Sequence, residues 1–168
     1  MTETVPLQGC REIIETLLPT ETVIYEAPDP SEAPRPDLPY VGIRTLSDRG
    51  LSTPYRKTTS IGPDNPGDPE DARVTEQQER QALVMVTLYG ASSMARGLRI
   101  SIGHASAGVI PVWRARGISA TLAVDLEDVT ELVGNRHEEA AQLQLWIRYR
   151  ASVYDDVYSI KTTVVNYS

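Results

Sequence analysis

Residues 141–150 have the sequence AQLQLWIRYR, in which apolar and polar side chains alternate. The odd positions, from Ala141 to Tyr149, are the apolar set, and the even positions, from Gln142 to Arg150, carry glutamines, arginines and Trp146. Because successive side chains of a β-strand point to opposite faces, this period of two predicts a strand with one face on a core. Trp146 falls on the face opposite to that core.

Neighbouring segments extend this pattern into a sheet. Residues 118–126 (ISATLAVDL) alternate in the same way and predict a second strand. Residues 158–165 (YSIKTTVV) are rich in β-forming residues, and the polar residues 154–156 (YDD) before them predict a turn or a short helical turn. The C-terminal third of the chain is therefore predicted to be mostly β-sheet.

Two helices are predicted elsewhere. Thr4 and Pro6 suit a helix start and Pro19 its end, and the apolar stripe between them consists of Leu7, Cys10, Ile13, Ile14, Leu17 and Leu18. Ser92 is predicted to cap a second helix, whose core-facing stripe is Ala91, Met94, Ala95, Leu98, Ile102 and Ala105. Gly97 and Gly103 in that helix indicate close packing against a sheet.

Three further strands are expected at residues 22–27, 40–46 and 81–89. The last is apolar on both faces, which is typical of a central strand. Five prolines make residues 28–39 an extended connector, and Pro111 leaves residues 109–113 unassigned. The sum predicts an α+β fold, with a mixed or mostly antiparallel sheet of about five strands and two main helices on one face.

Residues 47–78 are polar and rich in proline and glycine, with an acidic cluster at 64–71. They are expected to form a long polar loop inserted in one domain that spans residues 1–168. Loops of this length in compact domains are usually functional or disordered. A neighbouring subunit or another partner is the expected contact of this loop.

The composition excludes several classes of protein. The net charge is −7 and the pI is about 4.8, which argues against a dedicated nucleic-acid binder. Cys10 is the single cysteine, so an internal disulfide and a cysteine-based metal cluster are excluded. The start of the chain lacks a signal pattern, and no apolar run approaches ~18 residues, so we expect a soluble protein without membrane contact.

Chemical motifs are absent from the sequence. Residues 137–139 (HEE) resemble a set of metal ligands only superficially. Asp155-Asp156 is interpreted as part of a solvated turn in preference to a catalytic acid pair. Capping explains Ser92 better than nucleophilic catalysis does, and residues 64–71 lack the ligand spacing of a calcium loop. We therefore expect no catalytic residue, no cofactor and no metal.

The polar face of residues 141–150 is the better candidate for function. Tryptophan flanked by arginine is typical of protein–protein hot spots, although a helix covering this face would make Trp146 part of a second core. Basic and aromatic residues around the 47–78 loop are the other candidates. The predicted interface residues are Arg44, Tyr55, Arg56, Lys57, Trp146, Arg148 and Arg150.

From about residue 36 onward the chain resembles the neck or tail terminator proteins of long-tailed bacteriophages. The resemblance is carried by residues 35–41 (RPDLPYV), 86–90 (VTLYG), 128–132 (DVTEL), 139–145 (EAAQLQL) and 154–160 (YDDVYSI). The chain departs from the family pattern at Ala140, where a basic residue is expected, and in its longer, more acidic 47–78 loop. Both departures concern the subunit contacts and leave the fold unaffected.

This resemblance implies a structural virion protein at the neck, assembled in the host bacterial cytoplasm. Such proteins form a ring, generally of six copies, that caps the tail tube, stops its polymerisation and meets the connector proteins of the head. DNA would pass through the lumen without specific binding. The alternatives are another neck component (a head–tail joining or tail-completion protein), a small hydrolase using Asp155, Asp156 and His137, or a monomeric binding module using the 47–78 loop.

Overall fold

The computed structural model describes residues 5–26, 36–62, 71–133 and 136–157. The chain forms two compact units. Unit 1 consists of residues 1–49 and 80–149, and unit 2 consists of residues 50–79 and 150–168. The strands β2, β4 and β8 contribute residues to both units, and the prediction of a single domain over residues 1–168 stays a prediction.

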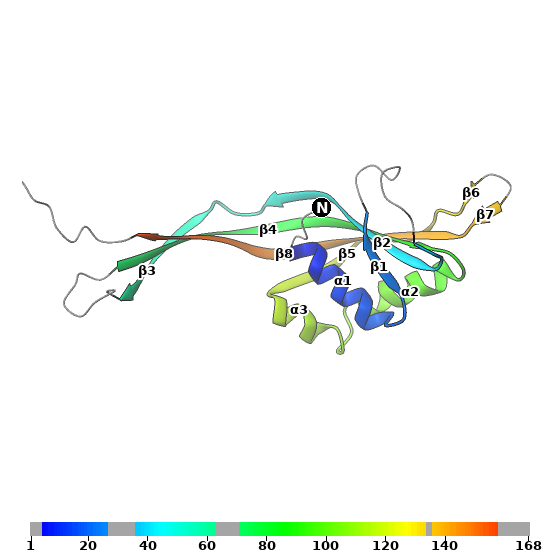
Figure 1. Ribbon diagram of the computed structural model, residues 1–168, viewed down its shortest axis with the longest axis horizontal. Coiled ribbons are helices and arrows are strands. Elements are labelled where there is room, and N and C mark those ends of the chain that lie inside the picture. The colour runs from blue at the N-terminus through cyan, green and yellow to red at the C-terminus, as the bar shows by residue number, and fades with distance from the viewer. Residues whose placement is uncertain (1–4, 27–35, 63–70, 134–135, 158–168) are drawn as a thin grey trace, which may run out of the picture. The chain divides into compact units, whose positions relative to one another are not determined.

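The described residues form three helices and eight strands (Figure 1). In chain order these are α1 (Val5–Leu17), β1 (Thr22–Tyr25), β2 (Tyr40–Gly50), β3 (Tyr55–Gly62), β4 (Asp71–Tyr89), α2 (Ser93–Gly103), α3 (Ile110–Arg116), β5 (Ile118–Asp128), β6 (Glu131–Val133), β7 (Arg136–Glu138) and β8 (Ala140–Val157). The main sheet has the order β1-β2-β4-β8-β5, with β3 paired to β4 off this path, while β6 and β7 form a separate two-stranded sheet.

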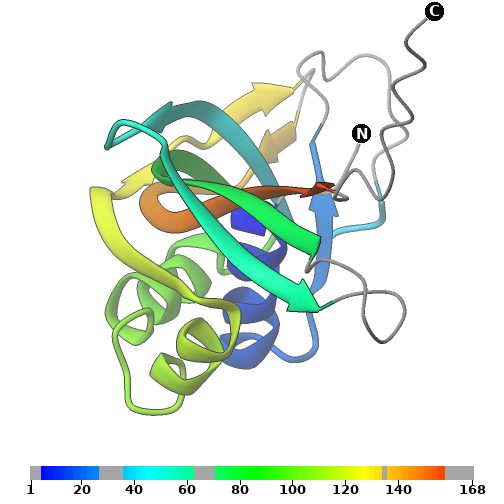
Figure 2. The same ribbon diagram turned by 90° about the vertical axis from the view of Figure 1, so that its left-hand side faces the viewer.

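The sheet is mostly antiparallel, which confirms the predicted α+β class. β5 pairs with β8 and β3 pairs with β4 in antiparallel fashion, whereas β1 lies parallel to β2. β4 occupies an interior position, as its apolar sequence predicts. In unit 1 all three helices lie on one face of the sheet, one helix more than predicted (Figures 1 and 2).

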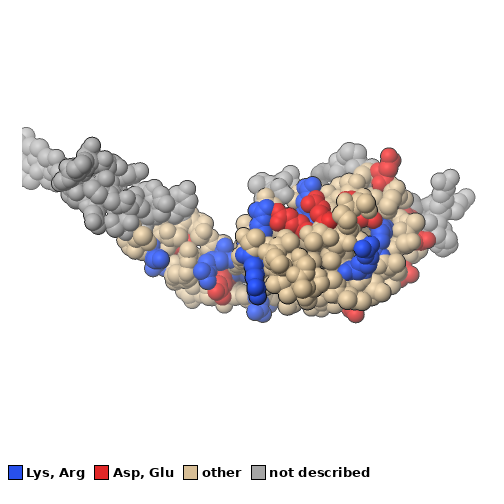
Figure 3. All heavy atoms as spheres, turned by 90° about the horizontal axis from the view of Figure 1, so that it is seen from below, with Lys and Arg blue, Asp and Glu red and all other residues tan. Residues whose placement is uncertain are grey.

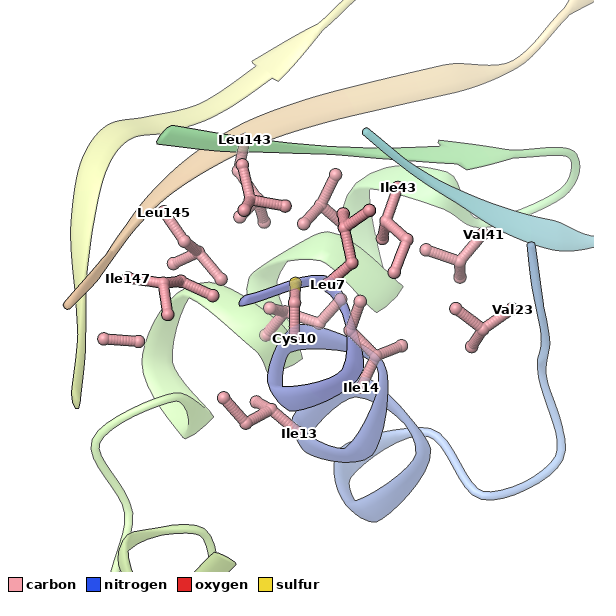
Figure 4. Packing of buried hydrophobic residues seen from close by; sticks show 14 of the residues in the cluster. Leu7, Cys10, Ile13, Ile14, Val23, Val41, Ile43, Leu143, Leu145 and Ile147 are labelled. Carbon is pink, nitrogen blue, oxygen red and sulfur yellow. The ribbon is translucent and has the colours of Figure 1, made fainter. Parts of the chain in front are cut away.

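The core of unit 1 lies between this sheet face and the helices. Ala141, Leu143, Leu145 and Ile147 of β8 are fully buried, as their period of two predicts. Figure 4 shows the β8 residues Leu143, Leu145 and Ile147 above the apolar face of α1, with Cys10 between the two layers. The predicted stripe of α1 is confirmed, since five of its six members are buried and Leu17 packs against the core.

The predicted orientation of α2 is wrong. All six residues of its predicted core stripe are exposed, and the helix instead buries Ser93, Arg96, Gly97 and Ile100. The reason is that Arg96 finds buried partners, and Gly97 lets the helix approach Leu126 of β5, whose side chain occupies the space that a Cβ would need. Apolar periodicity alone gives no sign of either contact.

Ser92 does not cap α2, contrary to the prediction. Its backbone is left-handed (φ 60°, ψ 27°), and its side chain makes no capping hydrogen bond. The backbone N–H of Ser92 donates instead to Oε2 of Glu139 at 2.9 Å. The helix start is therefore held by a carboxylate from the residue before β8.

Residues 109–113, which the sequence leaves unassigned, belong largely to α3. Pro111 lies in the first turn of this helix, where its missing N–H costs nothing, and Gly117 ends the helix with φ 63°. Trp113 of α3 is buried in the core of unit 1.

The expectation of a long loop at residues 47–78 is wrong for most of its length. β2 continues to Gly50, and β3 pairs with the first half of β4, with Arg56 opposite Glu76 and Tyr55 opposite Gln77. Cross-strand pairs of this kind stabilise strands made of polar residues, which a search for apolar alternation does not predict. Residues 63–70, which hold most of the acidic cluster, lie outside the described residues.

Two other expectations concern the chain's connectors and C-terminus. The turn predicted at residues 154–156 is wrong, because β8 continues to Val157. The strand predicted at residues 158–165 lies outside the described residues, as does most of the proline-rich connector. Residues 36–39 of that connector form neither helix nor strand.

Candidate interaction surfaces

The predicted interface residues are divided between the two units. Arg44 of β2 and Trp146 and Arg148 of β8 belong to unit 1. The β3 residues 55–57 and Arg150 of β8 belong to unit 2. The structure thus offers two groups of candidates, each described within its own unit.

Trp146 lies on the sheet face opposite to the helices, across from Thr121 of β5. Its side chain is half-buried, and the guanidinium of Arg49 lies over its ring, 5.5 Å from the ring centroid. Arg148 on the same strand face is exposed. Among the described residues no helix covers this face, so Trp146 is not part of a second core beneath a helix. Its ring is partly exposed and is contacted by the guanidinium of Arg49.

Arg44 is partly buried. Its Nη2 donates to Sδ of Met85 at 3.7 Å, and its Nε has no hydrogen-bond partner among the described residues. Thr87 Oγ1 is buried without a described partner as well. The role of Arg44 in an interface stays a prediction.

Unit 2 has few buried side chains. Every described side chain from residue 50 to residue 59 is exposed, and Val74 is the buried hydrophobic residue of the described part of this unit. Leu51, Tyr55 and Val153 are 43%, 46% and 73% exposed. Apolar groups so placed are available to a partner.

Charged side chains accompany these apolar groups in unit 2. Arg56 stands opposite Glu76 in the strand register, and Arg150 lies 3.5 Å from Glu79. Lys57 stands opposite Thr75, so no acid faces it across the strands. Lys57 therefore shares a strand face with the exposed ring of Tyr55, whose hydroxyl donates to Gln77, while Arg56 lies on the opposite face.

A second surface, which the sequence prediction missed, lies on α2. Met94, Leu98 and Ile102 follow one another at a spacing of four, so they lie on one helix face. They are 41%, 51% and 72% exposed. The apolar spacing of these residues is visible in the sequence, but it predicts a core-facing stripe. The burial of Arg96, which turns the stripe outward, is not visible in the sequence.

An acidic residue of β5 lies beside this helix. Ser101 of α2 donates to Oδ1 of Asp125 at 2.9 Å, which places that carboxylate beside the helix. The backbone N–H of Leu126 and the Ser101 hydroxyl lower the pKa of Asp125, and hydrogen bonds from Thr130 lower that of Asp128. With Glu127, these groups make the end of β5 anionic. We call residues Met94, Leu98, Ile102 and Asp125 the α2–β5 surface.

Figure 3 views the molecule from the side that bears the helices. In unit 1 an uncharged area is visible there between groups of basic and acidic side chains.

The residues considered as catalytic or metal-binding candidates do not form a site in the described part of the chain. The carboxylate of Glu139 accepts the Ser92 N–H, and Ser93 is buried in α2. In the described parts of the chain, no group of three or more His, Cys, Asp or Glu side chains is placed to hold a metal ion. Asp155 and Asp156 lie on β8 and His137 on β7, with side chains outside the described part, so the hydrolase alternative stays untested.

None of the described helices has the length and the apolar character needed to cross a bilayer.

Comparison with known proteins identifies one family. The family model for phage neck terminator proteins matches residues 8–168. No curated protein matches the chain.

Proposed function

The chain belongs to the phage neck terminator protein family, and from this premise we propose that it forms a ring, of six copies, that caps the tail tube. As a member of this family it is a structural protein of the bacteriophage neck and a part of the virion. The ring stops further polymerisation of the tube and connects it to the head. The family match over residues 8–168 carries this proposal.

The arrangement of exposed groups supports assembly with copies of the same chain. A closed ring requires a heterologous contact, in which one patch of each subunit meets a different patch of the next. The α2–β5 surface and the exposed groups of unit 2 are two different patches on one chain. Trp146 and Arg148 remain candidates for contacts with other neck components.

The partners follow from this position in the particle. The tail tube protein lies on one side of the ring and a head connector protein on the other. The protein acts without turnover and needs no cofactor. DNA passes through the lumen without specific binding, because a chain with a net charge of −7 repels phosphates rather than holding them.

Deletion of the gene tests the role of the protein in tail assembly. A phage lacking it should produce tails of uncontrolled length, visible by electron microscopy, and wild-type protein supplied in trans should restore their length. Tails of normal length beside unattached, filled heads would contradict termination. That result would instead indicate a head–tail joining or tail-completion protein.

Cryo-electron microscopy of isolated tails tests the ring. One ring of this chain at the head-proximal end of each tube is the expected density. A single copy, or copies distributed along the tube, would overturn the proposed ring.

A further inference from the structure

We propose that copies of the ring meet edge to edge, by parallel pairing of β3 in one copy with residues 150–157 of β8 in the next. Both stretches belong to unit 2. This contact rests on the proposed ring and deepens it, since it names the strands through which neighbouring copies meet. Its two halves are different edges of one chain, so repetition of the contact gives the head-to-tail order that ring closure needs.

Two strand edges of unit 2 have no partner among the described residues. β4 is the described neighbour of β3, so the other edge of β3 is unpaired. β8 has β4 and β5 as described neighbours. β5 begins at Ile118, opposite Tyr149, so residues 150–157 of β8 extend beyond it and are paired on the β4 side alone. The unpaired N–H and C=O groups of such edges are ready to pair with another strand.

A second copy of this chain fits these edges. β3 spans eight residues, and the stretch from Arg150 to Val157 has the same length. Neither stretch contains a proline, which would block an edge, and the register of β3 is regular from Tyr55 to Ser60. Val74 is the buried hydrophobic residue of the described part of unit 2, so the packing of side chains gives this ribbon little support. Joining the edges of successive copies places the ribbon in a continuous sheet.

The direction of the strands decides how the edges meet. β3 is antiparallel to β4. β8 is antiparallel to β4 as well, because Arg150 lies beside Glu79, whereas the N–H of Gly90, just after β4, donates to the oxygen of Glu139, just before β8 (Figure 1). β3 and the end of β8 therefore run in the same direction. Neighbours in a ring of six are related by a sixth of a turn, which cannot reverse a strand, so the two edges meet in parallel.

The faces of the ribbon limit the register of this pairing. Thr58 lies opposite Val74, and Arg150 forms an ion pair with Glu79. Val74 and Glu79 are an odd number of residues apart on β4, as Arg150 and Val153 are on β8, so Thr58 and Val153 lie on the same face. The rotation that relates two copies of a ring keeps this face. The odd-numbered residues of β8 can therefore lie beside Thr58 of the next copy, and the even-numbered residues cannot.

Disulfide crosslinking between two single-site chains tests the contact. Thr58→Cys is mixed with isotope-labelled Ala151→Cys, Val153→Cys or Asp155→Cys, which together allow the register to shift by two residues either way. Ser152→Cys is the matched control, because its exposed side chain lies on the same strand but on the other face. A disulfide needs Cα atoms about 4.4–6.8 Å apart, and adjacent strands, about 4.8 Å apart, meet this condition.

Mass spectrometry of the full chains gives the readout, under native conditions before oxidation and under denaturing, non-reducing conditions after it. We expect rings in every mixture, heterodimers between Thr58→Cys and at least one of the three odd-numbered sites, and no heterodimer with the control. Cys10 is fully buried and adds no link. Lys57→Cys mixed with Ser152→Cys tests the same pairing on the opposite face and replaces the first set if Thr58→Cys fails to assemble.

Four results would overturn the contact. Assembled rings in which Thr58→Cys links to none of the odd-numbered sites would do so and leave the proposed ring intact. Equal linkage of the control site would contradict the shared face, and homodimers of Thr58→Cys would show that β3 pairs with itself. A wild type that stays monomeric at every concentration would also overturn the contact, and the density on isolated tails then decides the ring separately.

Discussion

Nη1 of Arg96 lies 2.7 Å from Oε2 of Glu21, and only a tenth of each side chain is exposed. Nη2 of Arg96 also donates to the backbone oxygens of Tyr89 and Gly90, at 2.7 Å and 3.2 Å. One guanidinium therefore ties α2 to the end of β4 and to the turn before β1. This set of bonds decides which face of α2 turns inward and leaves Met94, Leu98 and Ile102 outside.

Glu21→Ala is expected to lower the free energy of unfolding by about 3 kcal/mol, because it leaves a buried cation without its counter-charge. The matched control is Glu15→Ala, which removes the exposed ion pair between Arg11 and Glu15 on α1 and should cost less than about 0.5 kcal/mol. Urea titration of both variants measures the difference. Equal losses would show that the Arg96 pair contributes no more than a surface pair.

Ile100→Ala and Leu98→Ala should lower the free energy of unfolding by different amounts, although the two residues are only two positions apart on α2. Ile100 is fully buried, so its truncation should cost about 3 kcal/mol through lost burial and a cavity. Leu98 is half-exposed, and its truncation should change the free energy of unfolding of the monomer by no more than about 0.5 kcal/mol. A larger loss from Leu98→Ala would contradict the observed orientation of α2.

The sequence predicts those parts of the fold in which one face of an element is apolar. The strands β5 and β8 and the helix α1 follow this rule, because burial of one face is the main force that orders them. α2 breaks the rule, since a buried arginine replaces the apolar stripe inside. β3 could not be predicted by this rule, because its side chains are mostly polar and its strand conformation is held by pairing with β4.

The candidate surfaces show the same division. Trp146 and Arg148 are predicted on the outer strand face by alternation alone, and the structure places them there. The α2 stripe could not be predicted as a surface, because an interface helix and a core helix have the same period. The ion pair between Arg96 and Glu21, which are 75 residues apart in the chain, and the packing of Gly97 against Leu126 distinguish the two.

Tyr149→Phe should lower the free energy of unfolding by about 1 kcal/mol, since the hydroxyl of Tyr149 donates to Oδ2 of Asp48 at 2.6 Å in a partly exposed position. Burial and this bond raise the pKa of Tyr149 above 10.0. The contribution is thus present below pH 10 and is lost as the pH rises through the higher pKa of the folded state.

Ultraviolet difference absorbance between the wild type and Tyr149→Phe isolates the titration of this residue from that of the other tyrosines. Its midpoint should lie above the ordinary value, and Asp48→Asn should move it down, because the carboxylate that accepts the bond is gone. A wild-type midpoint at or below the ordinary value would contradict the bond between Tyr149 and Asp48.

The thiol of Cys10 should be inert in the folded protein. Cys10 is fully buried between α1 and the sheet, and burial raises its pKa from 9.0 to about 12. At pH 8 this lowers the thiolate fraction about a thousandfold, and the thiolate is the reactive form. The folded state also holds its proton where the unfolded state has lost it, so stability should fall as the pH rises from 9 toward 12 and stay unaffected below.

Labelling with a thiol reagent at pH 8 should be slow without urea and complete with it, and Cys10→Ala should lose less stability than the wild type between pH 8 and pH 10.5. Rapid labelling of the folded chain would place Cys10 at the surface and contradict the packing of α1 on the sheet.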